Sequence, residues 1–275
     1  MKAMAHIGSI TIYPIKSLDG VSVERAEIAP HGGLAGDREY AIFDATGRLI
    51  NGKRAPRVHA IRATYDLAAQ TVTLGGDTFT LGDARIDACL SEHFGFAVHV
   101  RRGAFPDHTR TPGPSIVSSA TLAAAAELFA LTPEEMRARF RPNLTIDDTS
   151  AFEEDRYIRT ATAGVVRCGK VRVHAIEHCG RCVVPSRDPN TGTVIRDFAK
   201  RLSHWRETNL PDWTDRATLP HYYHLAILTR VPQTELGKRI AIGDRVRFGS
   251  DAPERHTARD RVAALARRVL RVVWR

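Results

Sequence analysis

The chain has 275 residues, 43% of them hydrophobic, which is enough for one large or two moderate domains with buried cores. No apolar run approaches the roughly 18–20 residues of a membrane-spanning helix, no secretory signal is recognised, and four cysteines make no disulfide scaffold, so we expect a cytoplasmic protein. The formal net charge of +9 suits a phosphorylated cofactor, an acidic protein or anionic lipid. Nucleic acid is not expected, because no zinc-finger, basic-zipper or RNP-like motif is present.

Short β runs dominate the first hundred residues. They alternate in part between apolar and polar side chains, and glycine-rich turns separate them, for example Gly75-Gly76-Asp77. Many short strands with such turns predict a barrel or sandwich rather than a parallel α/β sheet. The predicted strands are 7–13, 21–28, 40–43, 60–65, 70–74, 78–81 and 96–100, with one short helix over 86–94.

A stretch rich in proline and glycine, 101–114, is predicted to link a first domain, 1–104, to a second, 115–250. The second domain opens with a strand and two helices. Either Ser118 or Ser119 caps the first helix, and Thr132 with Glu135 resembles the capping box of the second. The fold class is therefore mainly β with some α. The elements predicted here are strands over 115–117, 144–146, 157–166, 171–176, 225–229 and 246–248, and helices ending at 131, 139 and 205.

The segment 253–275 differs from the rest of the chain. Apolar residues recur at helical spacing from Val262 to Val273, arginines decorate the helix, and Trp274 lies near the end. The pattern predicts a basic amphipathic helix. We favour a helix that packs on its own domain, and peripheral contact with an anionic membrane is the alternative.

Two cysteines three residues apart, Cys179 and Cys182, lie between an apolar stretch and a turn rich in proline, asparagine and glycine. Thiols beside an arginine suit metal ligation or redox work, because a nearby cation favours the thiolate. A zinc site would need His174 and His178 as further ligands, crowded on one strand end. A thioredoxin-like pair would need a helix where prolines follow, and haem attachment would need a histidine in place of Val183. Two ordinary buried thiols are the remaining interpretation.

Five segments resemble, in the same order, motifs of the MOSC family, the domain type found at the C-terminus of molybdenum cofactor sulfurases. The resemblance is closest to the amidoxime-reducing branch of that family. It implies an N-terminal β-barrel domain over 1–104, a MOSC β-barrel domain over 115–250, and a molybdenum–pterin cofactor bound between them. The segments are 13–20 and 33–40 in the first domain, and 139–143, 178–192 and 243–246 in the second.

The resemblance also assigns individual residues to that cofactor. Cys182 is the implied ligand of the molybdenum, for which a thiolate is a natural soft ligand. Gly180 departs from the pattern, because close eukaryotic relatives carry a serine there, and a hydroxyl contact is lost. The implied phosphate and pterin contacts are Lys16, Ser17, Arg38, Ser118, Arg141, Asn143, Gly180 and Arg181.

The implied activity is the reduction of N-hydroxylated small molecules by this bound cofactor, with Asp188 as a candidate proton donor. No ferredoxin-like cysteine spacing follows, so electrons are expected from a separate redox protein of the ferredoxin or flavodoxin type. Pyridoxal phosphate is not expected, because no lysine motif for it is recognised. The rival interpretation is a carrier that holds the cofactor, or sulfur as a persulfide, on Cys182. A weaker one is a zinc-stabilised interaction module.

Overall fold

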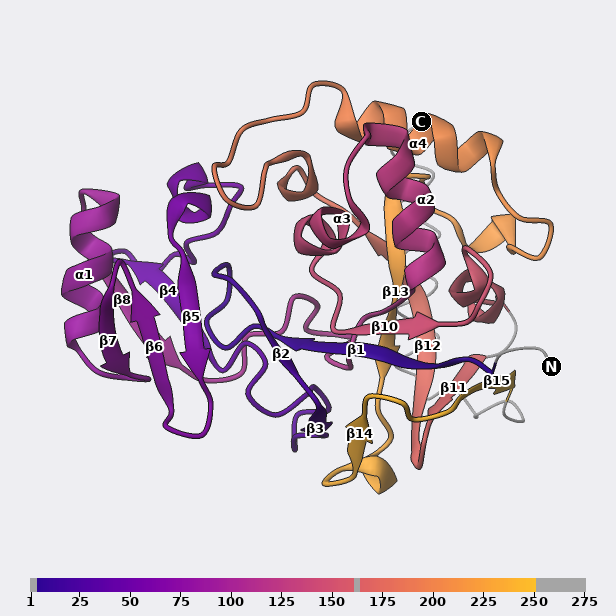
Figure 1. The fold of residues 1–275 in the computed structure, drawn as a ribbon, viewed down its shortest axis with the longest axis horizontal. Coiled ribbons are helices and arrows are strands. Elements are labelled where there is room, and N and C mark those ends of the chain that lie inside the picture. The colour runs from indigo at the N-terminus through magenta and orange to yellow at the C-terminus, as the bar shows by residue number, and fades with distance from the viewer. Residues whose placement is uncertain (1–3, 161–163, 251–275) are drawn as a thin grey trace.

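The computed structural model of the protein describes residues 4–160 and 164–250, which form a smaller and a larger lobe (Figure 1). The described chain is mainly β with four α-helices, as the sequence predicts. The helix predicted over 253–275 lies outside the described residues. Within those residues, no helix is both long enough and apolar enough to cross a bilayer.

The larger lobe is built on an eight-stranded sheet with the order β15-β11-β12-β13-β9-β10-β1-β2. Every pair in it is antiparallel except β9 with β10. In the described chain the sheet stays open, with β15 and β2 at its edges. Its strands are β1 (His6–Ile12), β2 (Val21–Val23), β9 (Ile116–Ser118), β10 (Leu144–Asp147), β11 (Gly164–Cys168), β12 (Val171–Gly180), β13 (His224–Arg230) and β15 (Val246–Ser250).

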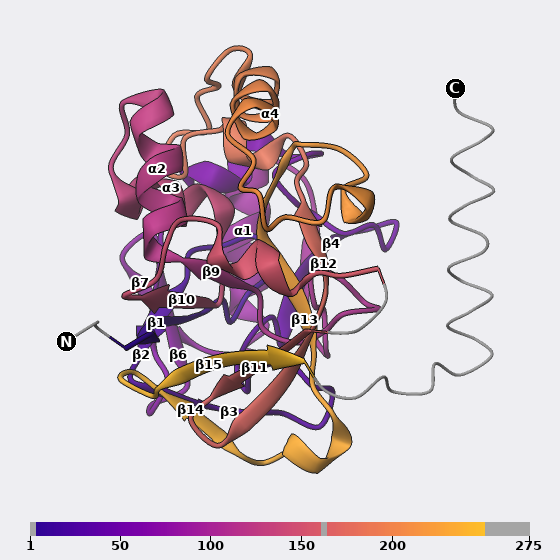
Figure 2. The same cartoon turned by 90° about the vertical axis from the view of Figure 1, so that its right-hand side faces the viewer.

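Three helices gather on one side of this sheet: α2 (Ser119–Phe129), α3 (Pro133–Phe140) and α4 (Phe198–Thr208) (Figure 2). They enclose an apolar core in which the rings of Phe129 and Phe198 stack at 4.1 Å. Thr132 caps α3 by accepting a hydrogen bond from the Glu135 backbone N–H at 3.1 Å. The Glu135 carboxylate pairs with Arg139, so only half of the predicted capping box forms.

The smaller lobe holds two small sheets and one helix. In one sheet β4 (Tyr40–Asp44) pairs with β8 (Val98–Arg102). The other sheet has the order β5 (Ala63–Asp66), β6 (Thr71–Leu74), β7 (Asp77–Thr80), and the helix is α1 (Arg85–Phe94). Apart from these two sheets, β3 (Arg25–Glu27) pairs with β14 (Arg239–Ala241). The 3-10 turns of the chain are η1 (Pro56–Ala60), η2 (Glu153–Tyr157), η3 (Val184–Ser186), η4 (Arg216–Thr218) and η5 (Gln233–Glu235).

Three predicted strands differ from the observed elements. The run 21–28 forms two strands, because its halves pair with different neighbours, β1 and β14. The run 60–65 begins inside η1, which Pro56 starts by presetting a helical φ. The run 157–166 begins inside η2, and the strand described within it, β11, is Gly164–Cys168.

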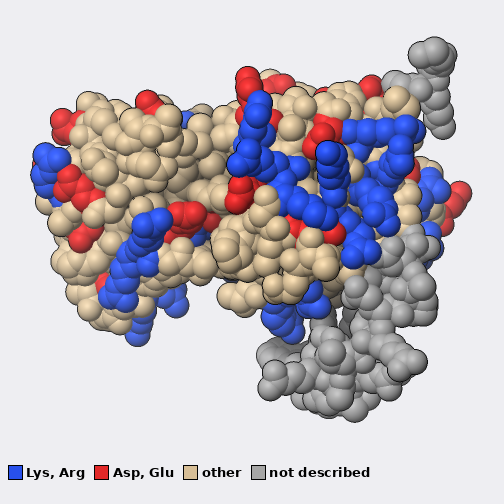
Figure 3. All heavy atoms as spheres, turned by 90° about the horizontal axis from the view of Figure 1, so that it is seen from below, with Lys and Arg blue, Asp and Glu red and all other residues tan. Residues whose placement is uncertain are grey.

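Lysine and arginine side chains gather on the face seen from below, at the end that carries the large sheet (Figure 3). Strand register also brings arginines together, because Arg167 on β11 pairs with Arg172 on β12 and with Arg247 on β15. Like charges directly opposite one another on neighbouring strands destabilise a sheet. Glu235 offsets part of this charge, because its Oε1 lies 4.0 Å from Arg172 Nε.

Candidate functional site

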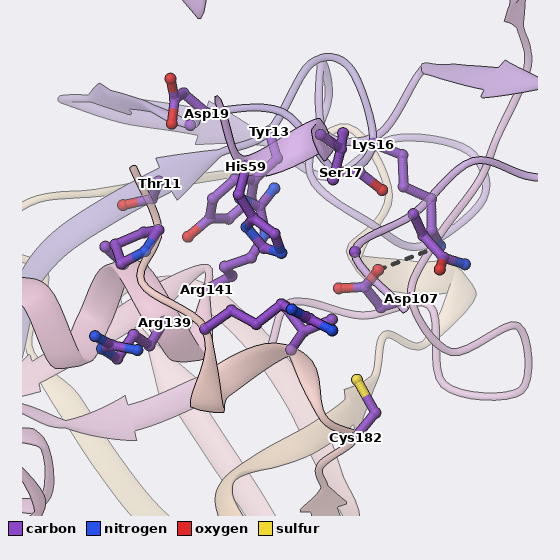
Figure 4. Close-up of a pocket in the computed structure, with 18 of the residues that line it drawn as sticks. Thr11, Tyr13, Lys16, Ser17, Asp19, His59, Asp107, Arg139, Arg141 and Cys182 are labelled. Carbon is purple, nitrogen blue, oxygen red and sulfur yellow. Dashed lines mark ion pairs between the residues drawn. The ribbon is translucent and has the colours of Figure 1, made fainter. Parts of the chain in front are cut away.

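A cavity of about 870 Å³ lies between the lobes, and side chains from both of them line it (Figure 4). Its volume falls in the range of roughly 300–1,000 Å³ that is typical of ligand sites. Eight lysines and arginines line it against three carboxylates, an excess that suits an anionic ligand. The cations are Lys16, Lys53, Arg62, Arg137, Arg139, Arg141, Arg181 and Arg187, and the carboxylates are Asp19, Asp107 and Glu134.

Two predicted cofactor contacts, Lys16 and Arg38, converge on one carboxylate, Asp107. Lys16 Nζ lies 3.2 Å from Asp107 Oδ1 and donates to two backbone carbonyls of the same loop, each at 2.9 Å. Arg38 donates to Asp107 Oδ2 at 2.7 Å and also pairs with Asp37. Burial works to raise the pKa of Asp107, but Arg38 and Lys16 outweigh it and hold that pKa below its usual range. Asp107 therefore positions both cations and neutralises part of their charge.

Arg141 carries a positive charge into the cavity without such a partner. It follows the last turn of α3, and its Nη2 donates to the Leu18 carbonyl at 2.7 Å. Its guanidinium lies 4.1 Å from the centroid of the Tyr13 ring, and that of Arg38 lies 4.7 Å from the same centroid. In the described chain no carboxylate lies within ion-pair distance of Arg141. Burial and the charge of Arg38 lower its pKa, but a guanidinium stays charged at neutral pH.

The loop after β12 turns its two cysteines into different surroundings. Cys182 is half-buried and lines the cavity (Figure 4). Cys179 is 1% exposed, belongs to the core under the helices, and its Sγ accepts a hydrogen bond from Arg181 Nη1 at 2.9 Å. In the described residues neither sulfur belongs to a cluster of potential metal ligands. The zinc site considered for this cysteine pair is therefore not supported.

Arg181 and a tyrosine fasten this loop. Arg181 Nη2 donates to the Phe140 carbonyl at 2.7 Å. The Nε of Arg181 is also buried but has no hydrogen-bond partner. The Tyr223 hydroxyl donates to the Cys182 carbonyl at 3.0 Å, and burial raises the pKa of Tyr223 to about 12. The loop is thus held to the end of α3 through Arg181 and to Tyr223, the residue directly before β13.

Gly180 lines the cavity beside a histidine. A Cβ at this position would come within 3.1 Å of the His221 ring, so a serine here would require the ring to shift by a few tenths of an ångström. His221 also lines the cavity, and burial lowers its pKa, so its ring is neutral at pH 7. An imidazole therefore lies beside the position where the resemblance implies a serine.

The three other predicted contacts, Ser17, Asn143 and Ser118, lie differently. Ser17 lines the cavity, with a φ of 79° that is unusual for a serine. Asn143 lines only a second cavity of about 30 Å³, and its amide Nδ2 donates to the Thr11 carbonyl at 3.1 Å. Ser118 lines neither cavity. Its hydroxyl instead caps α2 by accepting a hydrogen bond from the Thr121 N–H at 3.0 Å.

Asp188, the candidate proton donor, does not line the cavity. Its Oδ1 accepts hydrogen bonds from two backbone N–H groups of its own turn, at 2.9 Å each. Burial works to raise its pKa, but these hydrogen bonds lower it below the usual range. The carboxyl is therefore ionised at neutral pH and is not placed to donate a proton.

Sequence reasoning missed Asp107 and His108, which line both cavities. They lie in the stretch 101–114, predicted to be a linker because of its prolines and glycines. A pair of titratable side chains in a loop was the available signal, since loops often carry functional residues.

The mainly β fold holds a cation-lined cavity with a half-buried thiol, which suits an anionic small molecule beside a cysteine. Residues 4–88 match the MOSC N-terminal beta barrel domain, and residues 114–247 match the MOSC domain. These matches cover most of the chain, which therefore belongs to the MOSC family.

Curated relatives are distant in sequence but extensive in coverage. Mitochondrial amidoxime reducing component 2 of Bos taurus is 25% identical, over 71% of this chain and 70% of the relative. Mitochondrial amidoxime-reducing component 1 of Danio rerio is 23% identical, over 80% of this chain and 81% of the relative. Molybdenum cofactor sulfurase of Homo sapiens is 22% identical over 74% of this chain, but the match spans only 29% of that longer protein.

Brief alkylation of the folded protein with iodoacetamide is expected to modify Cys182 much faster than Cys179, because only Cys182 is half-exposed in the cavity. Cys168 is the internal control: it is buried, and burial raises its pKa to about 12. Peptide mass spectrometry at several reaction times measures the three rates. Equal rates for Cys179 and Cys182 would contradict the arrangement of the loop.

Proposed function

We propose that the chain binds a molybdenum–pterin cofactor in the cavity between the lobes and reduces N-hydroxylated compounds. The observation that carries the proposal is that an unpaired guanidinium, Arg141, and a half-buried thiol, Cys182, line the same cavity. A phosphorylated group with a soft metal needs both a cation and a thiolate. The names of the relatives support a function connected with the molybdenum cofactor.

The residues of the cavity fit such a group. Arg141 and the buried Nε of Arg181 have donor capacity that the protein leaves open. Lys16 would act as a point charge, while Arg141 would contact a phosphate in bidentate fashion. Asp107 restricts where an anion can lie, because it already occupies one side of Lys16 and Arg38. Cys182 would supply the protein ligand to the metal.

The reaction R–NH–OH + 2 e⁻ + 2 H⁺ → R–NH₂ + H₂O sets what the protein must do. When bound, the cofactor supplies the oxygen-atom-transfer chemistry. The chain orients Cys182 through the Tyr223 hydroxyl at its carbonyl, and the partly enclosed cavity limits access of bulk water. Neutral His221 lines this cavity and can pass a proton from water by accepting it at one ring nitrogen and releasing one from the other.

Electrons would come from a separate redox protein with an acidic surface, of the ferredoxin or flavodoxin type. The net charge of +9 and the lysines and arginines that gather on one face (Figure 3) support this choice. Charge complementarity steers the encounter of two proteins and raises its rate.

The second candidate function is a carrier of the cofactor or of sulfur, which the match to molybdenum cofactor sulfurase favours. Cys182 would then bear a persulfide. Elemental and sulfur analysis of the purified protein separates the two functions. Molybdenum with a pterin phosphate and turnover of an N-hydroxylated substrate supports the reductase, whereas sulfane sulfur without molybdenum supports the carrier.

Cys182→Ser is expected to abolish turnover of an amidoxime and to shift the molybdenum X-ray absorption edge, because the soft ligand is lost. Cys179→Ser is the matched control and should leave both nearly unchanged, since Cys179 lies in the core rather than in the cavity lining. An inactive Cys179→Ser protein with an active Cys182→Ser protein would refute the ligand assignment.

Arg141→Ala is expected to lower molybdenum–pterin occupancy about tenfold or more, because a charged hydrogen bond contributes roughly 1.5–3 kcal/mol. Arg62→Ala removes the same charge from the same cavity, but its side chain is 55% exposed and pairs with Asp19, so its effect should be small. Pterin fluorescence after acid oxidation, per mole of protein, measures occupancy. Equal losses in both variants would mean that only net charge matters.

Reduction by an acidic donor protein is expected to slow steeply as salt rises from about 0.01 M to 0.15 M, where the screening length falls from about 30 Å to 8 Å. Stopped-flow rates with reduced flavodoxin measure this dependence, and dithionite reduction is the control that should barely change. A donor rate independent of ionic strength would mean that the basic face serves another partner.

A further inference from the structure

A cluster of side chains that could hold a metal ion, formed by Asp155, His178 and His224, lies outside the cavity lining. Their ligand atoms all lie within 4.8 Å of one another, and the residues are 2%, 5% and 1% exposed, respectively. They come from three elements: η2, β12 and β13. Their chemistry is unrelated to the thiol of Cys182.

Hydrogen bonding leaves one nitrogen of His178 as a lone-pair donor. The Thr218 hydroxyl donates to the Asp215 carbonyl at 2.6 Å, so its oxygen can only accept from His178 Nε2, 3.1 Å away. The ring proton is then on Nε2. Nδ1 lies 3.3 Å from Asp155 Oδ1 yet has no hydrogen-bond partner. Two lone pairs that face each other at this distance repel, so either a proton on Nδ1 or a metal ion must lie between them.

The same distance matches a coordinated metal. Ligand atoms about 2.0–2.1 Å from a tetrahedral zinc ion lie about 3.3 Å apart along an edge of the tetrahedron. His224 offers the third ligand, because both of its ring nitrogens are buried without partners.

Neighbouring side chains already hold the ligands in place. Asp155 Oδ2 accepts from Arg206 Nη2 and lies 3.4 Å from the Thr214 hydroxyl, which leaves Oδ1 free for a further partner. Thr218 fixes His178 through the nitrogen that would not bind metal. Such outer contacts orient ligands in metal sites and fix the histidine tautomer.

We propose that Asp155, His178 and His224 bind one zinc ion, with water as the fourth ligand. Two imidazoles favour zinc and its transition-metal neighbours over calcium and magnesium, which prefer oxygen. The site is independent of the proposed reductase function, because the ligands do not line its cavity.

The ion would hold together the strands from which the cysteine loop begins. His178 precedes Gly180 by two residues on β12, and His224 is the register partner of Gly180 on β13. A metal bound to both would join these strands to η2 just before the chain enters the loop. The expected role is structural.

The test uses Cys182→Ser protein, so that the cavity thiol cannot bind the added ion. After loading with zinc and removal of excess by gel filtration, we expect about one zinc per chain by plasma mass spectrometry. Cobalt loading should give a tetrahedral visible spectrum without a thiolate charge-transfer band. No retained zinc in the folded protein would overturn the proposal and leave a proton between His178 and Asp155 instead.

In the same background, His224→Ala and Asp155→Asn should lose the zinc, whereas His174→Ala should keep it. His174 is the matched control, since it is also a buried histidine of β12 but is not in the cluster. Thr218→Val keeps all three ligands and should weaken zinc binding by about 10–100-fold, so it tests the site even where a ligand variant fails to fold. Zinc retained in His224→Ala, or unchanged affinity in Thr218→Val, would overturn the assignment.

Discussion

The cavity depends on the antiparallel pairing of β1 with β10. This pairing brings the start of the chain against residues more than a hundred positions later, as in the partners Ile10 and Leu144. The segment that carries Tyr13 and Lys16 therefore lies next to the one that carries Arg141. The amide of Asn143 reinforces the junction, because its Nδ2 donates to the Thr11 carbonyl and its Oδ1 accepts from Ser115 N–H. Buried amides of this kind cost free energy when a partner is lost, so the junction resists opening.

The cations around that junction differ in their partners, because some pair with a carboxylate and Arg141 does not. Asp107 binds Lys16, which is partly exposed, and Arg38, which is buried, and stabilises two cations that would otherwise repel each other. Arg141 has no such carboxylate and is steadied by the Tyr13 ring and a carbonyl. Preorganised cations cost less conformational entropy when a ligand arrives, which is the general advantage of a built site.

The sequence predicts the fold class and most elements well, because local patterns dictate them. The cap at Ser118 and the hairpin at Gly75-Gly76 depend on residues a few positions apart. The split of 21–28 could not be predicted, since it depends on pairing with β14, more than two hundred residues away.

The candidate site divides in the same way. Motif resemblance picked out Lys16, Arg141 and Cys182, which the fold brings to one cavity. It gave no reason to expect Asp107, whose role comes only from the contacts that the loop makes. Ser118 matched a family position, yet its hydroxyl is committed to the start of α2. No recognisable sequence spacing links His178 to Asp155, so their cluster could not be predicted from the sequence.

The contact between Gly180 and His221 constrains how this chain can diverge. A Cβ at 180 would lie 3.1 Å from the His221 imidazole, so Gly180→Ser would require this exposed ring to shift by a few tenths of an ångström. With a smaller residue at 221 the same serine would need no such shift. The two positions are therefore coupled, and the effects of substitutions at 180 and 221 on stability should not simply add.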